Sequence, residues 1–162
     1  YDQAMMTFQV ARAGTALVAN LMTAALAVAL LITCWLAWRA AKAGRHFRQI
    51  IPIASLTAVM DLIFFNKVGS PQYVTWLAVP IILGVLYRTE RWRTPMFAVT
   101  AIALLTEFVY PVFYDSILSG QIWAMTFLLL RNICYLLLLI YANVRLSALA
   151  KAPAADQPLL AQ

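Results

Sequence analysis

The stretch that decides the fold class is residues 14–38, GTALVANLMTAALAVALLITCWLAW, which contains no charged side chain. A helix needs about 20 predominantly apolar residues to cross a hydrocarbon layer about 30 Å thick. Comparable apolar runs return at residues 50–65, 73–87, 95–114 and 122–142. The sequence therefore predicts an all-α, polytopic transmembrane helix bundle of about five spans.

The composition excludes an ordinary soluble domain. Of the 162 residues, 64% are hydrophobic and 11% are charged, and the mean hydropathy is +0.82. The two cysteines, Cys34 and Cys134, both fall inside apolar runs, where free thiols behave as small apolar groups. We therefore expect no disulfide framework, no metal site and no cofactor.

Successive spans place their connections alternately on the two sides of the membrane, and most of the basic residues fall on one side. Nine of the 12 Lys and Arg residues follow the first, third and fifth runs: Arg39, Lys42, Arg45, Arg48, Arg88, Arg91, Arg93, Arg145 and Lys151. Loops rich in Lys and Arg face the cytoplasm. This pattern predicts an inner-membrane protein with its N-terminus outside and its C-terminus in the cytoplasm, and it explains the net charge of +6 without nucleic-acid binding.

The domain organisation follows from the same pattern. We expect residues 1–147 to form the bundle and residues 148–162, which are rich in Ala and Pro, to form a disordered cytoplasmic tail. The third span contains Pro80 and Gly84 in its interior, which are tolerated where neighbouring helices cover them. The second and third spans are therefore expected at the centre, and the first and fifth against lipid.

Three ionisable residues, Asp61, Glu107 and Arg131, fall inside predicted spans. Each such group costs about 2.5–3.5 kcal/mol at mid-membrane, so these residues usually face a bundle interior or a wet cavity. Their positions place all three in or near the outer half of the membrane, which predicts one shared cavity open to the outside. Alternatively, Glu107 and Arg131 form a structural ion pair, and Asp61 pairs with Lys67 or accepts hydrogen bonds from nearby hydroxyls.

Tyrosines accompany two of these charges at helical spacing. Glu107, Tyr110 and Tyr114 are spaced i, i+3, i+7, and Arg131 and Tyr135 are spaced i, i+4. A wall of charges and aromatic hydroxyls of this kind is suited to a sugar.

The connection between the second and third spans reads NKVGSPQYVTW over residues 66–76. Gly69 suits the left-handed turn that ends a helix, Ser70 is a favoured N-cap, and Pro71 is favoured at the first helical position. The free N–H groups of a helix N-terminus form a site for an anion such as phosphate. Lys67 adds a cation beside that site.

The longer run NKVGSPQYVTWLAVP, residues 66–80, resembles a segment of GT-C class membrane glycosyltransferases. The likeness is greatest to the polyprenyl-phosphate-mannose-dependent alpha-mannosyltransferases of glycosyltransferase family 87. The matching residues are Asn66, Lys67, Ser70, Pro71, Gln72, Tyr73 and Trp76. The resemblance implies transfer of a sugar, mannose in that family, from a polyprenyl-phosphate donor to a lipid or glycan acceptor on the extracytoplasmic side.

The resemblance also suggests roles for individual residues. Lys67 and Arg131 would contact the donor phosphate, and Gln72, Tyr73 and Glu107 would bind hydroxyls of the sugar or acceptor. Asn66, Gly69, Ser70 and Pro71 would shape the loop. In the family the general base is an aspartate in an N-terminal extracytoplasmic loop, so the resemblance assigns no catalytic residue to this chain. The chain would then be the C-terminal half of a larger protein and inactive alone.

Two other functions fit the same residues. In the first, the chain is a small transporter or channel subunit in which Asp61, Glu107 and Arg131 form an intramembrane relay. In the second, it is a non-catalytic membrane assembly protein whose buried charges are structural. All three hypotheses have membrane lipids as partners.

Overall fold

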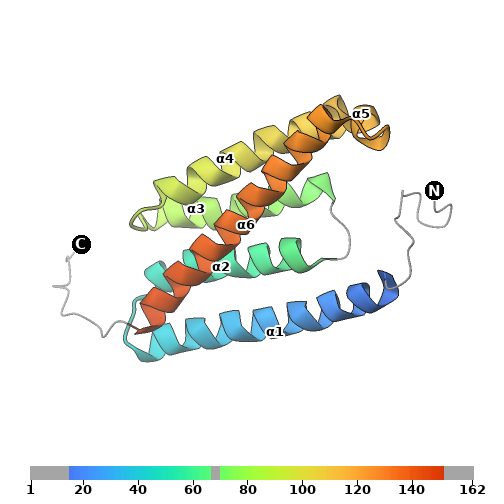
Figure 1. The fold of residues 1–162 in the computed structure, drawn as a ribbon. Helices are drawn as coiled ribbons and strands as arrows, with labels where there is room; N and C mark the ends of the chain where they lie inside the picture. The colour runs from blue at the N-terminus through green and yellow to red at the C-terminus, as the bar shows by residue number, and fades with distance from the viewer. Residues whose placement is uncertain (1–14, 67–69, 152–162) are drawn as a thin grey trace.

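The computed structural model describes residues 15–66 and 70–151, and all regular elements in these ranges are helices (Figure 1). The long helices are α1 (Thr15–Lys42), α2 (Phe47–Phe65), α4 (Arg93–Glu107) and α6 (Ile122–Lys151). The short elements are a 3-10 helix, η1 (Pro71–Leu77), which continues into α3 (Ala78–Leu86), a π-helical turn, η2 (Phe108–Val112), and α5 (Tyr114–Leu118). The predicted all-α fold is confirmed.

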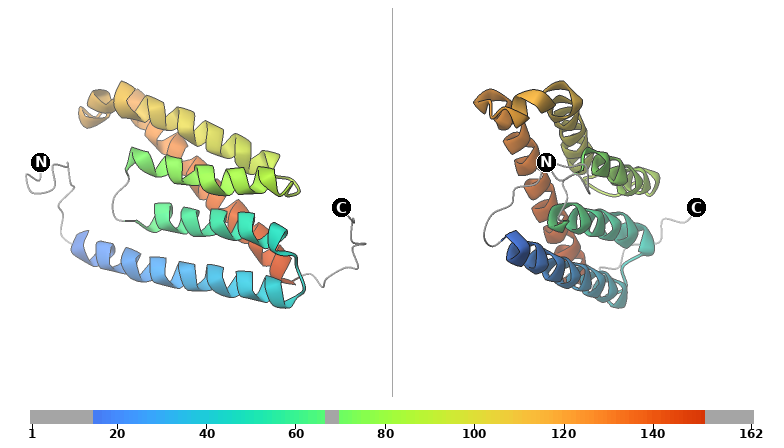
Figure 2. Two further views of the ribbon diagram at one scale, coloured as in Figure 1. Left: turned by 180° about the vertical axis from the view of Figure 1, so that it is seen from behind. Right: turned by 90° about the vertical axis from the view of Figure 1, so that its right-hand side faces the viewer.

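The helices form one layer with a single helix across it. α1, α2, η1–α3 and α4 lie side by side and alternate in direction, and α6 runs obliquely over one face of this layer (Figures 1 and 2). α6 packs against α1, α2 and α4. One end of the layer carries the α1–α2 and α3–α4 connections and the C-terminal end of α6, and the other end carries α5 and the start of η1 (Figure 1).

In the described ranges, four helices are long and apolar enough to cross a membrane. They span Leu17–Lys42, Phe47–Phe65, Arg93–Val112 and Ile122–Lys151, and a shorter apolar segment spans Pro71–Leu86. That shorter segment begins with the seven residues of η1, and a 3-10 helix rises about 2.0 Å per residue against about 1.5 Å for an α-helix. The segment therefore reaches about 28 Å, close to the thickness of the hydrocarbon layer. The fold is compatible with a multi-pass membrane protein.

The fifth predicted span, α6, has one face that packs against other helices and one exposed face. α6 buries one complete face, formed by Ala124, Tyr135, Leu138, Leu139, Ala142, Leu146 and Ala150. These residues recur at helical spacing and pack against three other helices. The opposite face of α6 is exposed and rich in Leu, which agrees with the expectation that the fifth span meets lipid. α2 contacts α1, η1, α3 and α6, so it occupies the central position expected for the second span.

Three boundaries also differ from the sequence-based prediction. α6 continues through Lys151, so the helix extends beyond the boundary expected at residue 147, and residues 152–162 lie outside the described ranges. The connection expected at residues 115–121 includes most of α5. The fourth span is interrupted at Tyr110, whose backbone is extended (φ −148°, ψ 123°).

The turn between α3 and α4 is fixed by a close contact between Trp92 and Gly84. The Trp92 indole covers the Gly84 backbone so tightly that it occupies the space a Cβ would need. The indole Nε1 also donates a hydrogen bond to the carbonyl oxygen of Ile81 at 3.0 Å. Gly84 is thus required for the close approach of Trp92 to α3.

We expect Gly84→Ala to lower the free energy of unfolding by about 1–3 kcal/mol, because the added methyl group overpacks against the indole. In a Trp92→Leu background the same substitution should be neutral or stabilising, since Ala is a better helix former than Gly by about 1 kcal/mol. Unfolding of the purified protein in detergent would measure both effects. Equal destabilisation in the two backgrounds would show that the indole is not what requires glycine.

Candidate functional site

A cavity of about 400 Å³ lies where α6 diverges from the end of α2. Its lining combines two apolar residues of α2 with polar residues of the α2–η1 connection, η1 and α6. The lining residues are Ile63, Phe64, Asn66, Ser70, Tyr73, Arg131, Asn132 and Tyr135. Pockets that hold small ligands have volumes of about 300–1,000 Å³. The cavity is therefore large enough for a ligand such as a sugar or a phosphate group.

Arg131 supplies the positive charge of this cavity. Its Nη2 donates to Asn132 Oδ1 at 3.4 Å, and its guanidinium carbon lies 5.9 Å from the centre of the Tyr135 ring. Its Nε is buried and has no hydrogen-bond partner among the described residues. A guanidinium presents its N–H donors in a planar fork that matches phosphate and carboxylate, so Arg131 is well suited to an anionic ligand.

Tyr135 holds the base of the cavity in place. Its side chain is only 8% exposed and is in contact with the buried hydrophobic core of the bundle. Since Tyr135 lies one turn after Arg131 on α6, this contact positions the face of α6 that carries the guanidinium.

The opposite wall comes from the segment that joins α2 to η1. Asn66 lies directly after α2, and its Nδ2 donates to the Tyr73 hydroxyl at 3.2 Å. Ser70 occupies the N-cap of η1 with an extended backbone, but its side chain makes no capping hydrogen bond. Pro71 is the first residue of η1, as predicted. The Ser70 side chain lines the cavity and forms part of its polar wall.

The structure brings together five of the residues that the sequence singled out. Asn66, Ser70, Tyr73 and Arg131 all line the cavity, and so does Tyr135, which the sequence pairs with Arg131. Arg131 and Tyr135 are distant from the other three in sequence. Lys67 and Gly69, which were expected to contact phosphate and to turn the chain, lie outside the described residues.

Two other predicted site residues do not line this cavity. Gln72 is exposed on η1, and Glu107 is exposed at the end of α4. The expected face of Glu107, Tyr110 and Tyr114 assumed a continuous helix, and the extended backbone of Tyr110 breaks it. The Tyr110 and Tyr114 rings still meet edge to face, with centroids 5.3 Å apart. The prediction that Glu107 shares a wall with Arg131 is therefore wrong.

Asp61 has a different environment from both other charges. Its side chain is 2% exposed, and its Oδ2 accepts a hydrogen bond from Thr33 Oγ1 of α1 at 2.7 Å. Of the three charged residues, only Arg131 lines the cavity. This cavity is thus not shared by the three charges, and it contains one of the three residues that the relay hypothesis requires. The alternative in which Asp61 accepts a hydrogen bond from a nearby hydroxyl is confirmed.

We expect Thr33→Val to lower stability by about 0.6 kcal/mol and by no more than about 1.7 kcal/mol, the range for hydrogen bonds between transmembrane helices. Asp61→Asn should be tolerated better than Asp61→Leu, because the amide oxygen can still accept from Thr33. Unfolding in detergent would compare the three variants. If the double variant Thr33→Val/Asp61→Leu loses no more stability than Asp61→Leu alone, the Thr33–Asp61 hydrogen bond is confirmed. If the losses of stability in the two single variants add up in the double variant, the prediction is contradicted.

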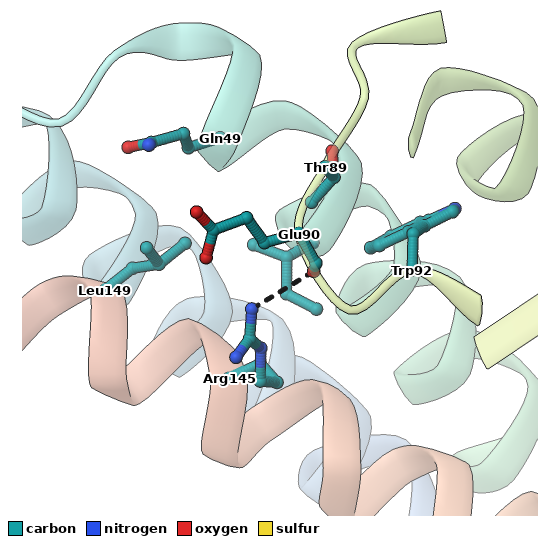
Figure 3. A pocket seen from close by; sticks show the side chains of 7 residues that line it. Gln49, Thr89, Glu90, Trp92, Arg145 and Leu149 are labelled. Atoms are coloured by element: carbon teal, nitrogen blue, oxygen red, sulfur yellow. Dashed lines mark hydrogen bonds between the residues drawn. The ribbon is translucent and has the colours of Figure 1, made fainter. Parts of the chain in front are cut away.

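A second, smaller cavity lies at the other end of the bundle (Figure 3). It has a volume of about 60 Å³ and is lined by Gln49, Ile53, Thr89, Glu90, Trp92, Arg145 and Leu149. Arg145 Nη2 donates to the carbonyl oxygen of Glu90 at 3.3 Å, which ties α6 to the α3–α4 turn. Because one water occupies about 30 Å³ of liquid, this space suits water and is too small for a sugar.

The sequence did not single out Asn132, Ile63 or Phe64 as lining residues. Asn132 directly follows Arg131, and neighbouring residues in a helix point in different directions, so the pattern gave no reason to select it. Tyr135 carried a recognisable signal, its i, i+4 spacing to Arg131. Among the described residues, no cluster of His, Cys, Asp or Glu could hold a metal ion.

Comparisons with protein families, curated proteins and solved structures give no significant match. The family resemblance of residues 66–80 therefore depends on the residues of that segment. The geometry adds that three of them, Asn66, Ser70 and Tyr73, face Arg131 across one cavity.

Proposed function

We propose that this chain is part of a membrane glycosyltransferase that binds a polyprenyl-phosphate-linked sugar, mannose by the family resemblance, in the cavity between α2, η1 and α6. The proposal rests on the observation that Arg131 lines the same cavity as Asn66, Ser70 and Tyr73. These three residues come from the segment that resembles the GT-C transferases, and Arg131 adds a half-buried cation whose Nε has no hydrogen-bond partner among the described residues.

The cavity lining matches the chemistry of such a donor. The guanidinium of Arg131 provides N–H groups for phosphate oxygens, and charge-assisted bonds of this type are about twice as strong as neutral ones. The side chains of Asn66, Ser70 and Asn132 offer donors and acceptors for sugar hydroxyls. Ile63 and Phe64 form an apolar side that suits the lipid chain.

In the proposed reaction, an acceptor hydroxyl attacks the anomeric carbon, and the bond from that carbon to the phosphate oxygen breaks. The bonding electrons pass to the phosphate, and the hydroxyl proton passes to a general base. Negative charge therefore grows on the phosphate, where preorganised cations and donors stabilise the transition state. We assign this role to Arg131 because it lines the cavity, and to Lys67 by the resemblance alone.

The general base is not one of the described lining residues, since none of them is Asp, Glu or His. The family resemblance puts the base in an N-terminal extracytoplasmic loop. The proposal therefore assigns donor binding and phosphate stabilisation to this chain, and it assigns proton abstraction to another segment. The acceptor, a lipid or a glycan, would approach from the extracytoplasmic side.

We expect Arg131→Gln to weaken binding of a polyprenyl phosphate by about 10- to 150-fold, the equivalent of one hydrogen-bonded charge at 1.5–3 kcal/mol. Arg131→Lys should bind with intermediate affinity, because lysine keeps the charge and loses the planar fork. Titration of the detergent-solubilised protein with decaprenyl phosphate, and sugar transfer in membranes from cells that express the complete gene, would measure the effect.

Arg93→Gln is the matched control, because Arg93 is an exposed arginine at the opposite end of the bundle. It should leave both binding and transfer unchanged. Equal affinity of the original protein and Arg131→Gln for decaprenyl phosphate would remove Arg131 from the site. Flux of an ion that depends on Asp61, together with no sugar transfer, would favour the transporter hypothesis instead.

A further inference from the structure

The last turns of α1 carry two cations that are each held over an indole ring. The guanidinium carbon of Arg39 lies 4.8 Å from the centre of the Trp35 ring, and Nζ of Lys42 lies 4.2 Å from the centre of the Trp38 ring. Both pairs have the i, i+4 spacing that places side chains together on a helix. All four residues are exposed, and we call them the α1 basic edge.

The charge around the α1 basic edge is strongly positive. The nine basic residues of the connections and helix ends lie at this end of the bundle, and Glu90 is the single carboxylate among the described residues there. The Glu90 side chain turns toward Gln49, Arg145 and Leu149 in the small cavity (Figure 3). The cations of the α1 basic edge therefore have no neutralising carboxylate beside them in the described part of the chain.

The length of α1 places these cations at the depth of lipid headgroups. Its 28 residues extend over about 42 Å, which exceeds the hydrocarbon thickness by about 12 Å. If the excess is shared between its ends, about four residues at each end lie in the headgroup layer. Arg39 and Lys42 fall in that layer, and Trp35 and Trp38 lie at its border, as is usual for indoles.

The surface next to the α1 basic edge is apolar and exposed. Val28, Leu31 and Ile32 are 55%, 70% and 47% exposed, respectively, and they continue the same helix toward the middle of the bundle. A ligand that satisfies both parts of this surface carries an anionic group at one end and a hydrocarbon chain at the other. A soluble anion or a nucleic acid would use only the charged part.

We infer that the α1 basic edge is a binding site for an anionic phospholipid, with the headgroup phosphate on Arg39 and Lys42 and an acyl chain along α1. Each indole holds its cation on one face and leaves the remaining N–H donors for phosphate oxygens. This site is separate from the cavity at Arg131, and it does not depend on the proposed transferase function.

Native mass spectrometry of the intact chain in detergent tests the site, with dioleoyl-phosphatidylglycerol and dioleoyl-phosphatidylcholine as probes. We expect the first bound phosphatidylglycerol to be held at least about tenfold more tightly than phosphatidylcholine. The double variant Arg39→Gln/Lys42→Gln should remove most of that preference, a loss of about 10- to 30-fold for two cations at the membrane surface. Circular dichroism would show that the variant keeps its helix content.

The control is Arg93→Gln/Lys151→Gln, which removes the same net charge from two exposed residues at the same end of the bundle. Neither of these side chains lies over an aromatic ring in the described structure. The control should keep the preference for phosphatidylglycerol. Equal losses in the two double variants would show a response to net charge alone and would overturn the inference, as would equal affinity of the original protein for the two lipids.

A third variant pair, Trp35→Leu/Trp38→Leu, keeps both cations and removes the rings. We expect a partial loss of the preference, because the cations are no longer held in one geometry. If this variant binds phosphatidylglycerol as the original protein does, the indoles have no part in the site, and a site built from cation–indole pairs is ruled out.

Discussion

The oblique crossing of α6 over the helix layer is the constraint on which the rest of the structure depends. In a bilayer, association between helices is driven by packing and by hydrogen bonds, because lipid chains are as apolar as leucine. The buried face of α6 includes three alanines that are 5% exposed or less, Ala124, Ala142 and Ala150, and small residues let helices approach closely. Because α6 is tilted, it lies against α1 and α2 near the basic end and against α4 and α5 at the other end. The cavity at Arg131 opens where it leaves α2.

Hydropathy was sufficient to predict the long helices, because an apolar segment in a membrane must satisfy its own backbone hydrogen bonds. It could not identify which face of α6 packs against the other helices. In a water-soluble protein a buried face differs from an exposed face in polarity, but on α6 both the packed and the lipid-exposed faces are apolar. The exposed Leu129 and Leu137 and the buried Leu138 and Leu146 have the same hydropathy. Which leucines meet another helix depends on the fit between helices, and one sequence does not contain that information.

The same distinction explains why the sequence identified only part of the candidate site. The position of a residue within a span gives its depth, and the depths of Asp61, Glu107 and Arg131 are similar. The direction in which each side chain points also depends on the rotation of its helix about its own axis. This rotation directs Asp61 toward Thr33 of α1 and Arg131 into the cavity. The start of η1 was more predictable, since proline is favoured at the first position of a helix and Pro71 is the first residue of η1. The sequence predicts that Asn66 and Tyr73 lie on the same side of the membrane as Arg131. This was the only indication that they line the same cavity.

Arg131 and the α1 basic edge present cations to phosphate in two physically different settings. Arg39 and Lys42 are exposed at a membrane surface, where salt screens each charge over about 10 Å and the cations are well hydrated. Arg131 has a buried Nε without a partner among the described residues, and a desolvated guanidinium that lacks a counter-charge is unfavourable. That cost falls when an anion enters the cavity and accepts a hydrogen bond from Nε. The free energy of binding therefore includes the gain from giving this group a partner. Binding at Arg131 should therefore respond weakly to ionic strength and strongly to the shape of the ligand, whereas binding at the α1 basic edge responds to salt and to the geometry of its cation–indole pairs.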